Sequence, residues 1–357
     1  MRRTLLRPTG FVDSPFGHDG KVARLAGGLG WFGLVELIHV GDRVETELLP
    51  VAGIESRFDD AVGAQWAALT RPRAPLVMGE RTIRLDQPQV MAILNVTPDS
   101  FSDGGQFASA EAAVQAGFDA AQAGAAIVDV GGESTRPGAR PVWEGDEIER
   151  VEPVVRALAG GGVAVSIDSR KAAVMERAAA VGARLVNDVS ALTWDHRAIE
   201  FVARSGLPVV LMHHQGSPET MQQNPSYPRG VLVEVYLWLE ERIAAAEAAG
   251  IRRENILVDP GIGFGKTVAH NLELMNGLAL FHGLGCAIVL GASRKRTVGA
   301  LHNEAPADRR LGGSIALAIK AAEQGAQLIR VHDVFETVQA LKVWRGLRDQ
   351  ALTPRLS

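Results

Sequence analysis

The sequence has only one cysteine and no long apolar run, whereas several cysteines or long apolar runs are common in secreted and membrane proteins. Only one of its 357 residues is cysteine, so a disulfide within the chain is excluded and a reducing cytoplasm is favoured. No apolar run approaches the roughly 18 residues that cross a bilayer. The charged start of the chain is not followed by the apolar segment of a signal peptide. We therefore expect a cytoplasmic protein without membrane partners.

An excess of charge of one sign is also absent. The chain has 37 Lys and Arg against 41 Asp and Glu, which gives a formal net charge of −4. This balance argues against nucleic acid or a membrane surface as the main partner. The hydrophobic fraction of 46% is enough for a large core. The length fits one large α/β domain with a smaller piece.

From about residue 92 onward the chain repeats one structural unit. A helical stretch ends at a glycine, two or three residues follow, and a strand rich in β-branched residues begins. Glycine suits the left-handed position just past a helix C-terminus. These glycines are Gly124, Gly182, Gly206 and Gly325. The candidate strands are Met91–Leu94, Ala126–Val130, Ala164–Ile167, Arg184–Val186, Pro208–Met212, Ile256–Val258, Ala287–Leu290 and Gln327–Val331.

These strands, alternating with about eight helices, predict an α/β fold, the closed TIM (β/α)8 barrel, with a small N-terminal α+β extension. A doubly wound open sheet is the competing architecture. We expect the extension at residues 1–75 and the barrel at 76–357. Within the extension, Trp31–Val40 and Val44–Val51 are predicted strands and Ser56–Thr70 a short helix. The sequence does not indicate what the extension does.

In such a barrel the C-terminal ends of all strands open onto one face, where catalytic residues gather. The polar strand endings are Asn95, Asp129, Asp168, Asn187, His213, Asp259, Ser293, Arg294, Lys295, Arg330 and His332. The first ending, Asn95–Gly105, is longer and more acidic than a connection requires, although a solvated turn has the same composition.

The chemistry of these endings suits a flat heterocycle that carries a diphosphate. A carboxylate accepts two parallel N–H bonds, so an amino-substituted ring fits the acids and amides, while Lys295 offers donors to a carbonyl or ring nitrogen. The planar guanidinium of Arg330 can stack on such a ring. Arg136, His332 and Asn95 suit a diphosphate and its metal. For any single Asp the alternative is a cap on the following helix.

Segments from about Leu76 to the C-terminus resemble dihydropteroate synthase of folate biosynthesis. They follow the family's order and cover about four-fifths of the chain. They are Asn95–Gly105, Asp129–Gly138, Ser166–Ser169, Val186–Val189, Leu211–Gly216, Asp259–Lys266, Ser293–Lys295 and Ile329–Asp333.

The resemblance implies a transferase that condenses 6-hydroxymethyl-7,8-dihydropterin diphosphate with 4-aminobenzoate to 7,8-dihydropteroate and diphosphate. It also implies Mg²⁺ bound at Asn95, a homodimer formed through the last helices, and a sulfonamide target. The implied pterin-binding residues are Asp129, Asp168, Asn187, Asp259, Lys295 and Arg330. Those for the diphosphate are Asn95, Arg136, Arg330 and His332, and those for the aminobenzoate are Thr135, Pro137 and Ser293.

The predicted catalytic residues are Asp99, Asp103 and Lys295. Loss of a metal-bound diphosphate leaves a cation on the pterin's exocyclic CH₂, which the two acids of the first loop can stabilise. The weakly basic arylamine then attacks without a strong base.

Three alternatives are weighed against this hypothesis. A pterin-dependent methyltransferase shares the barrel but should lack the Asn95–Gly105 loop, and a non-catalytic pterin-binding barrel should have lost Lys295, Arg136 or Asp99. The run Gly265-Lys266-Thr267 resembles a phosphate-binding P-loop, but Pro260 stands where that pattern requires glycine. Two departures from the family's pattern, Arg296 and His214, leave the details of the aminobenzoate site open.

Overall fold

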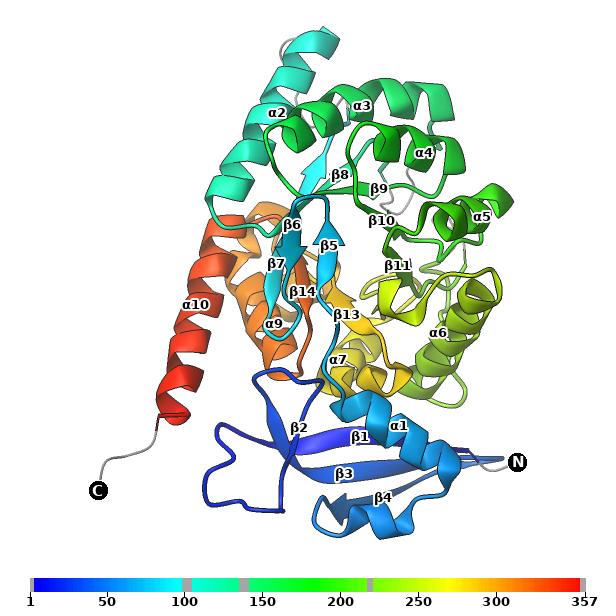
Figure 1. Cartoon of the computed structure of the whole chain (residues 1–357), viewed down its shortest axis with the longest axis vertical. Helices are drawn as coiled ribbons and strands as arrows, with labels where there is room; N and C mark the ends of the chain where they lie inside the picture. The colour runs from blue at the N-terminus through cyan, green and yellow to red at the C-terminus, as the bar shows by residue number, and fades with distance from the viewer. Residues whose placement is uncertain (1–2, 98–104, 135–140, 217–220, 354–357) are drawn as a thin grey trace.

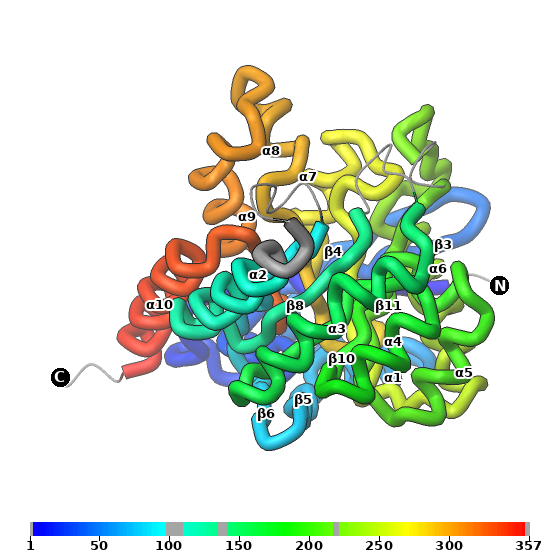
Figure 2. Tube along the Cα trace, turned by 90° about the horizontal axis from the view of Figure 1, so that it is seen from above, coloured from blue at the N-terminus to red at the C-terminus, as the bar shows by residue number. Residues whose placement is uncertain are grey.

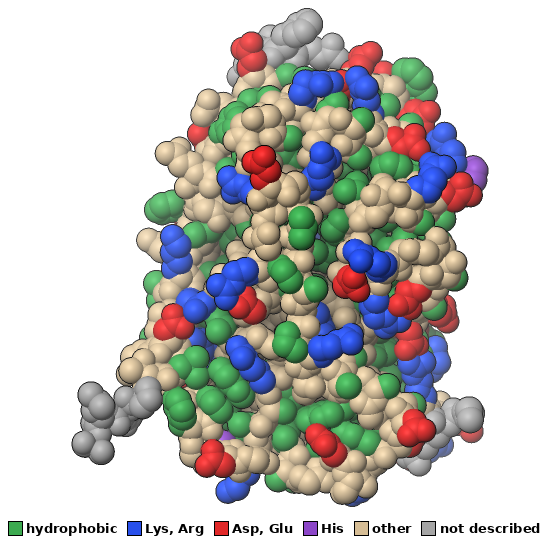
Figure 3. All heavy atoms as spheres, viewed as in Figure 1, with side chains coloured by type: hydrophobic (Ala, Val, Ile, Leu, Met, Phe, Trp, Pro, Cys, Tyr) green, Lys and Arg blue, Asp and Glu red, His purple; other side chains and the backbone are tan. Residues whose placement is uncertain are grey.

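The computed structural model describes residues 3–97, 105–134, 141–216 and 221–353, with the side chains of 105–109 left aside. Figure 1 shows a barrel wrapped by helices above a small antiparallel sheet formed by the N-terminal residues. Within these ranges, no helix is long and apolar enough to cross a membrane. The face in Figure 3 carries Lys and Arg interspersed with Asp and Glu, in keeping with the balanced composition.

Eight parallel strands form the closed barrel. They are β7 (Gln89–Asn95), β8 (Ile127–Gly131), β9 (Val165–Asp168), β10 (Leu185–Asp188), β11 (Val209–Met212), β12 (Ile256–Asp259), β13 (Ala287–Leu290) and β14 (Leu328–Val331). Strand β14 pairs with β7, so the sheet has no edge and the open-sheet alternative is excluded. Every predicted barrel strand is present, with its ends within two residues of those expected.

The helices lie outside the barrel strands (Figure 2). They are α2 (Gly105–Gln122), α3 (Glu144–Gly160), α4 (Ala172–Ala180), α5 (His196–Ser205), α6 (Val231–Ala248), α7 (Val268–Asn276), α8 (Arg296–Leu301), α9 (Leu311–Glu323) and α10 (Val334–Ala351). Apolar residues at helical spacing bury one face of α3, from Val151 to Leu158. The four repeat glycines all have positive φ, as the repeat predicts.

A hairpin closes the N-terminal end of the barrel. Its strands are β5 (Leu76–Met78) and β6 (Arg81–Ile83). Leu76, Met78 and Ile83 form one buried cluster with residues near the start of the barrel strands, such as Met91 and Ile127. Figure 2 shows the hairpin at the opposite end of the barrel from α8. The strand carboxyl ends are therefore the face left to form a site.

The N-terminal extension is an antiparallel sheet with one helix. Its elements are β1 (Arg3–Val12), β2 (Ala23–Arg24), β3 (Trp31–Val40), β4 (Val44–Pro50), the 3-10 turn η1 (Ile54–Arg57) and α1 (Asp60–Thr70). The two predicted strands are confirmed as β3 and β4. The helix begins later than predicted, because Asp59 caps it by accepting a bond from the Val62 amide at 2.8 Å. Strand β1, which pairs with the whole of β3, is not predicted from the sequence.

The extension packs on the segment that leads into β13. Helix α1 and strand β1 both contact the buried 3-10 segment η4 (Leu278–Leu284). The guanidinium of Arg73 donates to the carbonyls of His282 (2.9 Å) and Cys286 (3.0 Å). Cys286 is buried, and burial raises the pKa of its thiol to about 12, as suits a packing residue. These contacts lie at the amino end of β13, away from the residues that follow its carboxyl end.

Candidate active site

Arg330 joins two acidic strand endings at the mouth of the barrel. Its Nε donates to Asp129 Oδ2 at 2.6 Å, and its Nη2 donates to Asp168 Oδ2 at 2.6 Å. The three residues come from β14, β8 and β9, which are distant in sequence and meet because the barrel closes. Burial lowers the pKa of Arg330, but Asp129 and Asp168 outweigh this and raise it overall. Arg330 therefore carries its charge throughout the physiological range.

Asn187 extends this cluster to the end of β10. Its Nδ2 donates to Asp129 Oδ2 at 2.8 Å, and it is paired in register with Asp168 of β9. Asp129 is fully buried, and its Oδ1 has no hydrogen-bond partner within the described parts of the chain. A buried carboxylate oxygen of this kind is a strong acceptor for an N–H donor.

Two of the acids are held in surroundings that favour the neutral form. Burial raises the pKa of Asp168 to about 7, and Asp129 adds to this while Arg330 opposes it. Burial also raises the pKa of Asp259, although its Oδ1 accepts the Gly261 amide at 2.7 Å. Perturbed acids of this kind, placed together at a barrel mouth, are typical of a binding or catalytic site.

Lys295 lies beside Asp259. Its Nζ is 4.1 Å from the centre of the Phe264 ring, a cation–π contact with the loop after β12. The charge of Lys295 lowers the pKa of Asp259, so the two side chains are near enough to interact. The structure thus brings together the predicted pterin residues, namely Asp129, Asp168, Asn187, Asp259, Lys295 and Arg330.

The ends of β13 and β14 are joined by side chains that include two predicted site residues. Ser293 Oγ accepts the His332 amide at 3.2 Å and lies 3.1 Å from His332 Nδ1. Arg294 donates to Asp333 at 3.0 Å, which ties the same two strand ends. Ser293 and His332, predicted for different substrates, are therefore direct neighbours.

His213 follows β11, and its amide donates to the Asp259 carbonyl, but its side chain pairs with Lys266. Its Nδ1 lies 2.8 Å from Lys266 Nζ, and its ring packs 4.9 Å from that of Trp238 on α6. Lys266 is buried and also donates to the Phe264 carbonyl at 3.0 Å. Burial lowers the pKa of Lys266 to about 7 and that of His213 to about 2. The lysine of the P-loop-like run thus supports the β12 loop, a role with no signal in the sequence.

Asn95 ends β7 and is paired in register with Gly131 of β8. The side chain is half-buried, and its amide oxygen is a hard donor of the kind that Mg²⁺ prefers. Among the described residues, no three His, Cys, Asp or Glu side chains cluster as metal ligands. The remaining predicted residues, Asp99, Asp103, Thr135, Arg136 and Pro137, lie outside the described residues.

Comparison with known proteins gives consistent matches. A family model described as "Pterin binding enzyme" matches residues 91–332. The dihydropteroate synthase of Escherichia coli (strain K12) is 49% identical over 263 residues, covering 73% of this chain and 92% of that protein. The dihydropteroate synthase of Neisseria meningitidis serogroup B is 46% identical over 275 residues, covering 75% and 96%.

Solved structures give the same result. A Yersinia pestis dihydropteroate synthase with a sulfonamide drug complex has a TM-score of 0.73 at 46% identity, covering 77% of this chain and 99% of its own. The Xanthomonas albilineans enzyme in complex with 7,8-dihydropteroate has a TM-score of 0.71 at 42% identity, covering 78% and 100%.

Proposed function

Because this chain belongs to the dihydropteroate synthase family of pterin-binding enzymes, we propose that its acid cluster holds the pterin ring and its basic residues the diphosphate. The chain is a transferase of folate biosynthesis that condenses 6-hydroxymethyl-7,8-dihydropterin diphosphate with 4-aminobenzoate. The observation that carries the assignment of roles is the junction of Asp129, Asp168 and Asn187 with Arg330 at the open end of the barrel.

The pterin ring is recognised by matching donors and acceptors. Its amino group and ring N–H donate to the carboxylates of Asp168 and Asp259, and its carbonyl and ring nitrogen accept from Lys295 and Asn187. Burial of Asp168, Asp259 and Asn187 strengthens their bonds to the ring, since little water competes for these side chains. Arg330 stacks against the ring and contributes charge toward the diphosphate.

The chemical step follows from the charges. The bond between the exocyclic CH₂ and the diphosphate oxygen breaks, and its electron pair leaves with the diphosphate. Arg330, His332 and Arg136 stabilise the departing charge, while Asp99 and Asp103 stabilise the cation that remains. The amine nitrogen of 4-aminobenzoate then forms the C–N bond and loses a proton. Thr135, Pro137 and Ser293 form its binding site.

Mg²⁺ suits this site, because it takes few protein ligands and completes its coordination with substrate phosphates and water. Asn95 offers one oxygen donor at the end of β7. When bound, the ion neutralises diphosphate charge.

We also infer a cytoplasmic homodimer. Phe335, Val343 and Leu347 on α10 are 62%, 60% and 69% exposed and lie at helical spacing on one face. An apolar stripe of this kind is suited to contact between two copies. A relative is described with a sulfonamide drug, and we expect the same drug class to compete with 4-aminobenzoate here.

The order of bond breaking and bond making is the part of this proposal to test. We would measure kcat for a series of ring-substituted 4-aminobenzoates whose amines differ in nucleophilicity. Rate-limiting loss of diphosphate predicts nearly equal kcat values across the series. A kcat that rises steadily with amine nucleophilicity would show that attack and departure are concerted.

A further inference from the structure

The residue between two site residues has a backbone conformation that is rare for a side chain of its kind. Arg294 lies between Ser293 and Lys295, and its φ is 56°, in the left-handed region where a Cβ is disfavoured. The Lys295 amide donates to the Ala292 carbonyl at 3.4 Å, so Arg294 is the third residue of a turn, where a positive φ usually requires glycine. An arginine persists in this conformation only when surrounding contacts hold it there.

The turn directs its two neighbours toward different strand ends. Strand β13 pairs with β14 on one side and with β12 on the other. Ser293 is bonded to His332, which follows β14. Lys295 extends the other way, with its Nζ over the Phe264 ring in the loop after β12. The chain therefore changes direction at Arg294, the residue between them.

Both backbone groups of Arg294 are bonded to the start of α9. Its amide donates to Ser314 Oγ at 2.9 Å, and its carbonyl accepts from Arg310 Nη1 at 2.9 Å. Ser314 is buried, and its hydroxyl donates to the Arg310 carbonyl at 2.7 Å. These bonds satisfy polar groups of the turn that make no ladder bond in the barrel sheet. They fix the turn against α9.

The side chain of Arg294 fixes the turn against β14. Its guanidinium bonds to both carboxylate oxygens of Asp333, with Nε 3.0 Å from Oδ2. A planar contact with two donors fixes direction as well as distance, which the flexible ammonium of a lysine does not. Asp333 directly follows His332, so this contact lies beside the bond that joins His332 to Ser293. The turn is therefore held by α9 through its backbone and by β14 through one side chain.

We propose that Arg294 is a positioning residue for the binding of both substrates. It holds a left-handed turn that directs Ser293 to the end of β14 and Lys295 to the end of β12. When this turn relaxes, Lys295 loses its place beside Asp259, and Ser293 loses its place beside His332. The inference rests on the proposed function, which assigns Lys295 to the pterin and Ser293 to the aminobenzoate.

The test uses variants of the full-length enzyme that separate the turn from the charge. Arg294→Ala removes the contact with Asp333 and leaves a Cβ in a disfavoured backbone conformation. Arg294→Gly removes the same contact and the same charge, but glycine adopts the left-handed turn without a steric penalty. Asp333→Ala removes the contact and keeps the charge of Arg294. Arg84→Ala is the control, because Arg84 makes an Arg–Asp contact of the same kind with Asp86 in solvent.

Four quantities are measured for each variant: Tm, kcat, KM for 4-aminobenzoate, and Kd for 6-hydroxymethylpterin without its diphosphate. We expect Arg294→Ala to raise the pterin Kd about tenfold, as for a weakened charged hydrogen bond from Lys295. It should also lower kcat/KM for 4-aminobenzoate about tenfold or more, since small errors in position are costly.

The other variants show whether the turn carries the effect. Arg294→Gly should lose clearly less than Arg294→Ala in pterin Kd and in kcat/KM. Asp333→Ala should lose in the same direction. Combined with Arg294→Ala, it should add less than its own separate loss, since the two residues act through one contact. Arg84→Ala should match the wild type throughout.

Two results would overturn the proposal. One is an Arg294→Ala enzyme with wild-type pterin Kd and kcat/KM, even with a lowered Tm. The other is an Arg294→Gly enzyme that loses as much as Arg294→Ala, which would assign the effect to the charge of the guanidinium. If Arg294→Ala does not fold, Asp333→Ala decides by the same measures, and wild-type pterin Kd and kcat/KM in that variant overturn the proposal. A wild-type enzyme that releases no diphosphate would instead refute the proposed function.

Discussion

Arg330 Nη2 donates to Asp168 Oδ2 over 2.6 Å, so a basic residue of β14 bonds the acid of β9 that is assigned to the pterin. The amino group and ring N–H of a pterin would use the same carboxylate. Ligand binding therefore redistributes the hydrogen bonds of Asp168 between Arg330 and the pterin. We therefore expect substitution of Arg330 and substitution of Asp168 to weaken ligand binding, for different physical reasons.

Replacing Arg330 separates its two assigned roles. Arg330→Met should weaken binding of the pterin diphosphate by about 10–100-fold, the value of a lost charge-assisted contact. Binding of 6-hydroxymethylpterin should weaken less, because this compound carries no diphosphate. Arg330→Lys should not restore the loss, since lysine lacks the planar fork that spans Asp129 and Asp168. Calorimetric titration measures the affinity for both ligands. Equal losses of affinity for the two ligands would contradict a role of Arg330 in diphosphate binding.

The raised pKa of Asp168 predicts a pH dependence of pterin binding. Burial shifts this pKa to about 7, so the carboxyl is protonated below this pH and ionised above it. The pterin's donors require the ionised form, so affinity should rise with pH from about 5.5 to about 8. Asp168→Asn should bind more weakly and lose this dependence. A wild-type Kd that stays constant over the range would contradict the assignment.

Asn95 should determine the Mg²⁺ concentration that the reaction requires. Asn95→Ala removes an oxygen donor at the end of β7. We expect the Mg²⁺ concentration for half-maximal activity to rise by about 10-fold, as for loss of one of few protein ligands. Affinity for 6-hydroxymethylpterin, measured in EDTA, should stay at the wild-type value. Unchanged Mg²⁺ dependence in the variant would place the ion on other ligands.

The N-terminal extension should support the fold without taking part in the reaction. Arg73→Ala removes donors to the carbonyls of Ala68, His282 and Cys286. The free energy of unfolding should fall by roughly 2–4 kcal/mol, because buried carbonyls lose their partners. The exposed neighbour gives the control, Arg71→Ala, with an expected change within about 0.5 kcal/mol. Urea unfolding measures the free energy of unfolding of both variants. Their kcat values at 25 °C should be equal. A lower kcat in folded Arg73→Ala alone would connect the extension to catalysis.

Much of the fold could be predicted because its determinants are local. Four repeat glycines past helix ends precede barrel strands, and the apolar runs predict every barrel strand to within two residues. Strand β1 was missed, because its pairing with β3 joins residues that are about 20 to 37 positions apart in the sequence. Its mixed sequence, Arg3–Val12, lacks the pattern of a buried strand.

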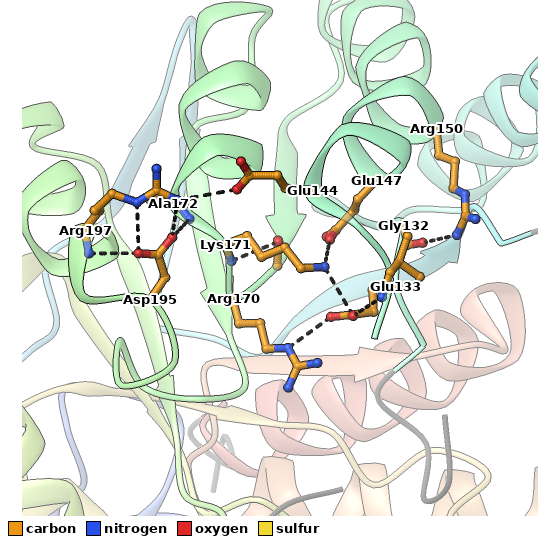
Figure 4. A network of polar contacts seen from close by, with 12 residues as sticks. Gly132, Glu133, Glu144, Glu147, Arg150, Arg170, Lys171, Ala172, Asp195 and Arg197 are labelled. Carbon is orange, nitrogen blue, oxygen red and sulfur yellow. Dashed lines mark hydrogen bonds and ion pairs between the residues drawn. The ribbon is translucent and has the colours of Figure 1, made fainter. Parts of the chain in front are cut away.

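The residues of the site also divide into those that the sequence predicts and those that only tertiary packing determines. Residues at strand ends share the mouth because the barrel closes, so Asp129, Asp168 and Asn187 could be predicted together. His213 also ends a strand, yet it pairs with Lys266, and only packing against α6 decides which way its ring lies. The buried ion pairs that Glu133 and Glu147 form with Arg170 and Lys171 (Figure 4) have no sequence signal, since they depend on side chains that meet from three separate parts of the chain.

The most direct test of the whole account is release of diphosphate from 6-hydroxymethyl-7,8-dihydropterin diphosphate with Mg²⁺, with and without 4-aminobenzoate. It should be made on the full-length protein and on a folded chain that begins at Leu76. The account predicts release that depends on 4-aminobenzoate in both, with 7,8-dihydropteroate as the product. Failure of the full-length protein to release diphosphate while still binding pterin would contradict it.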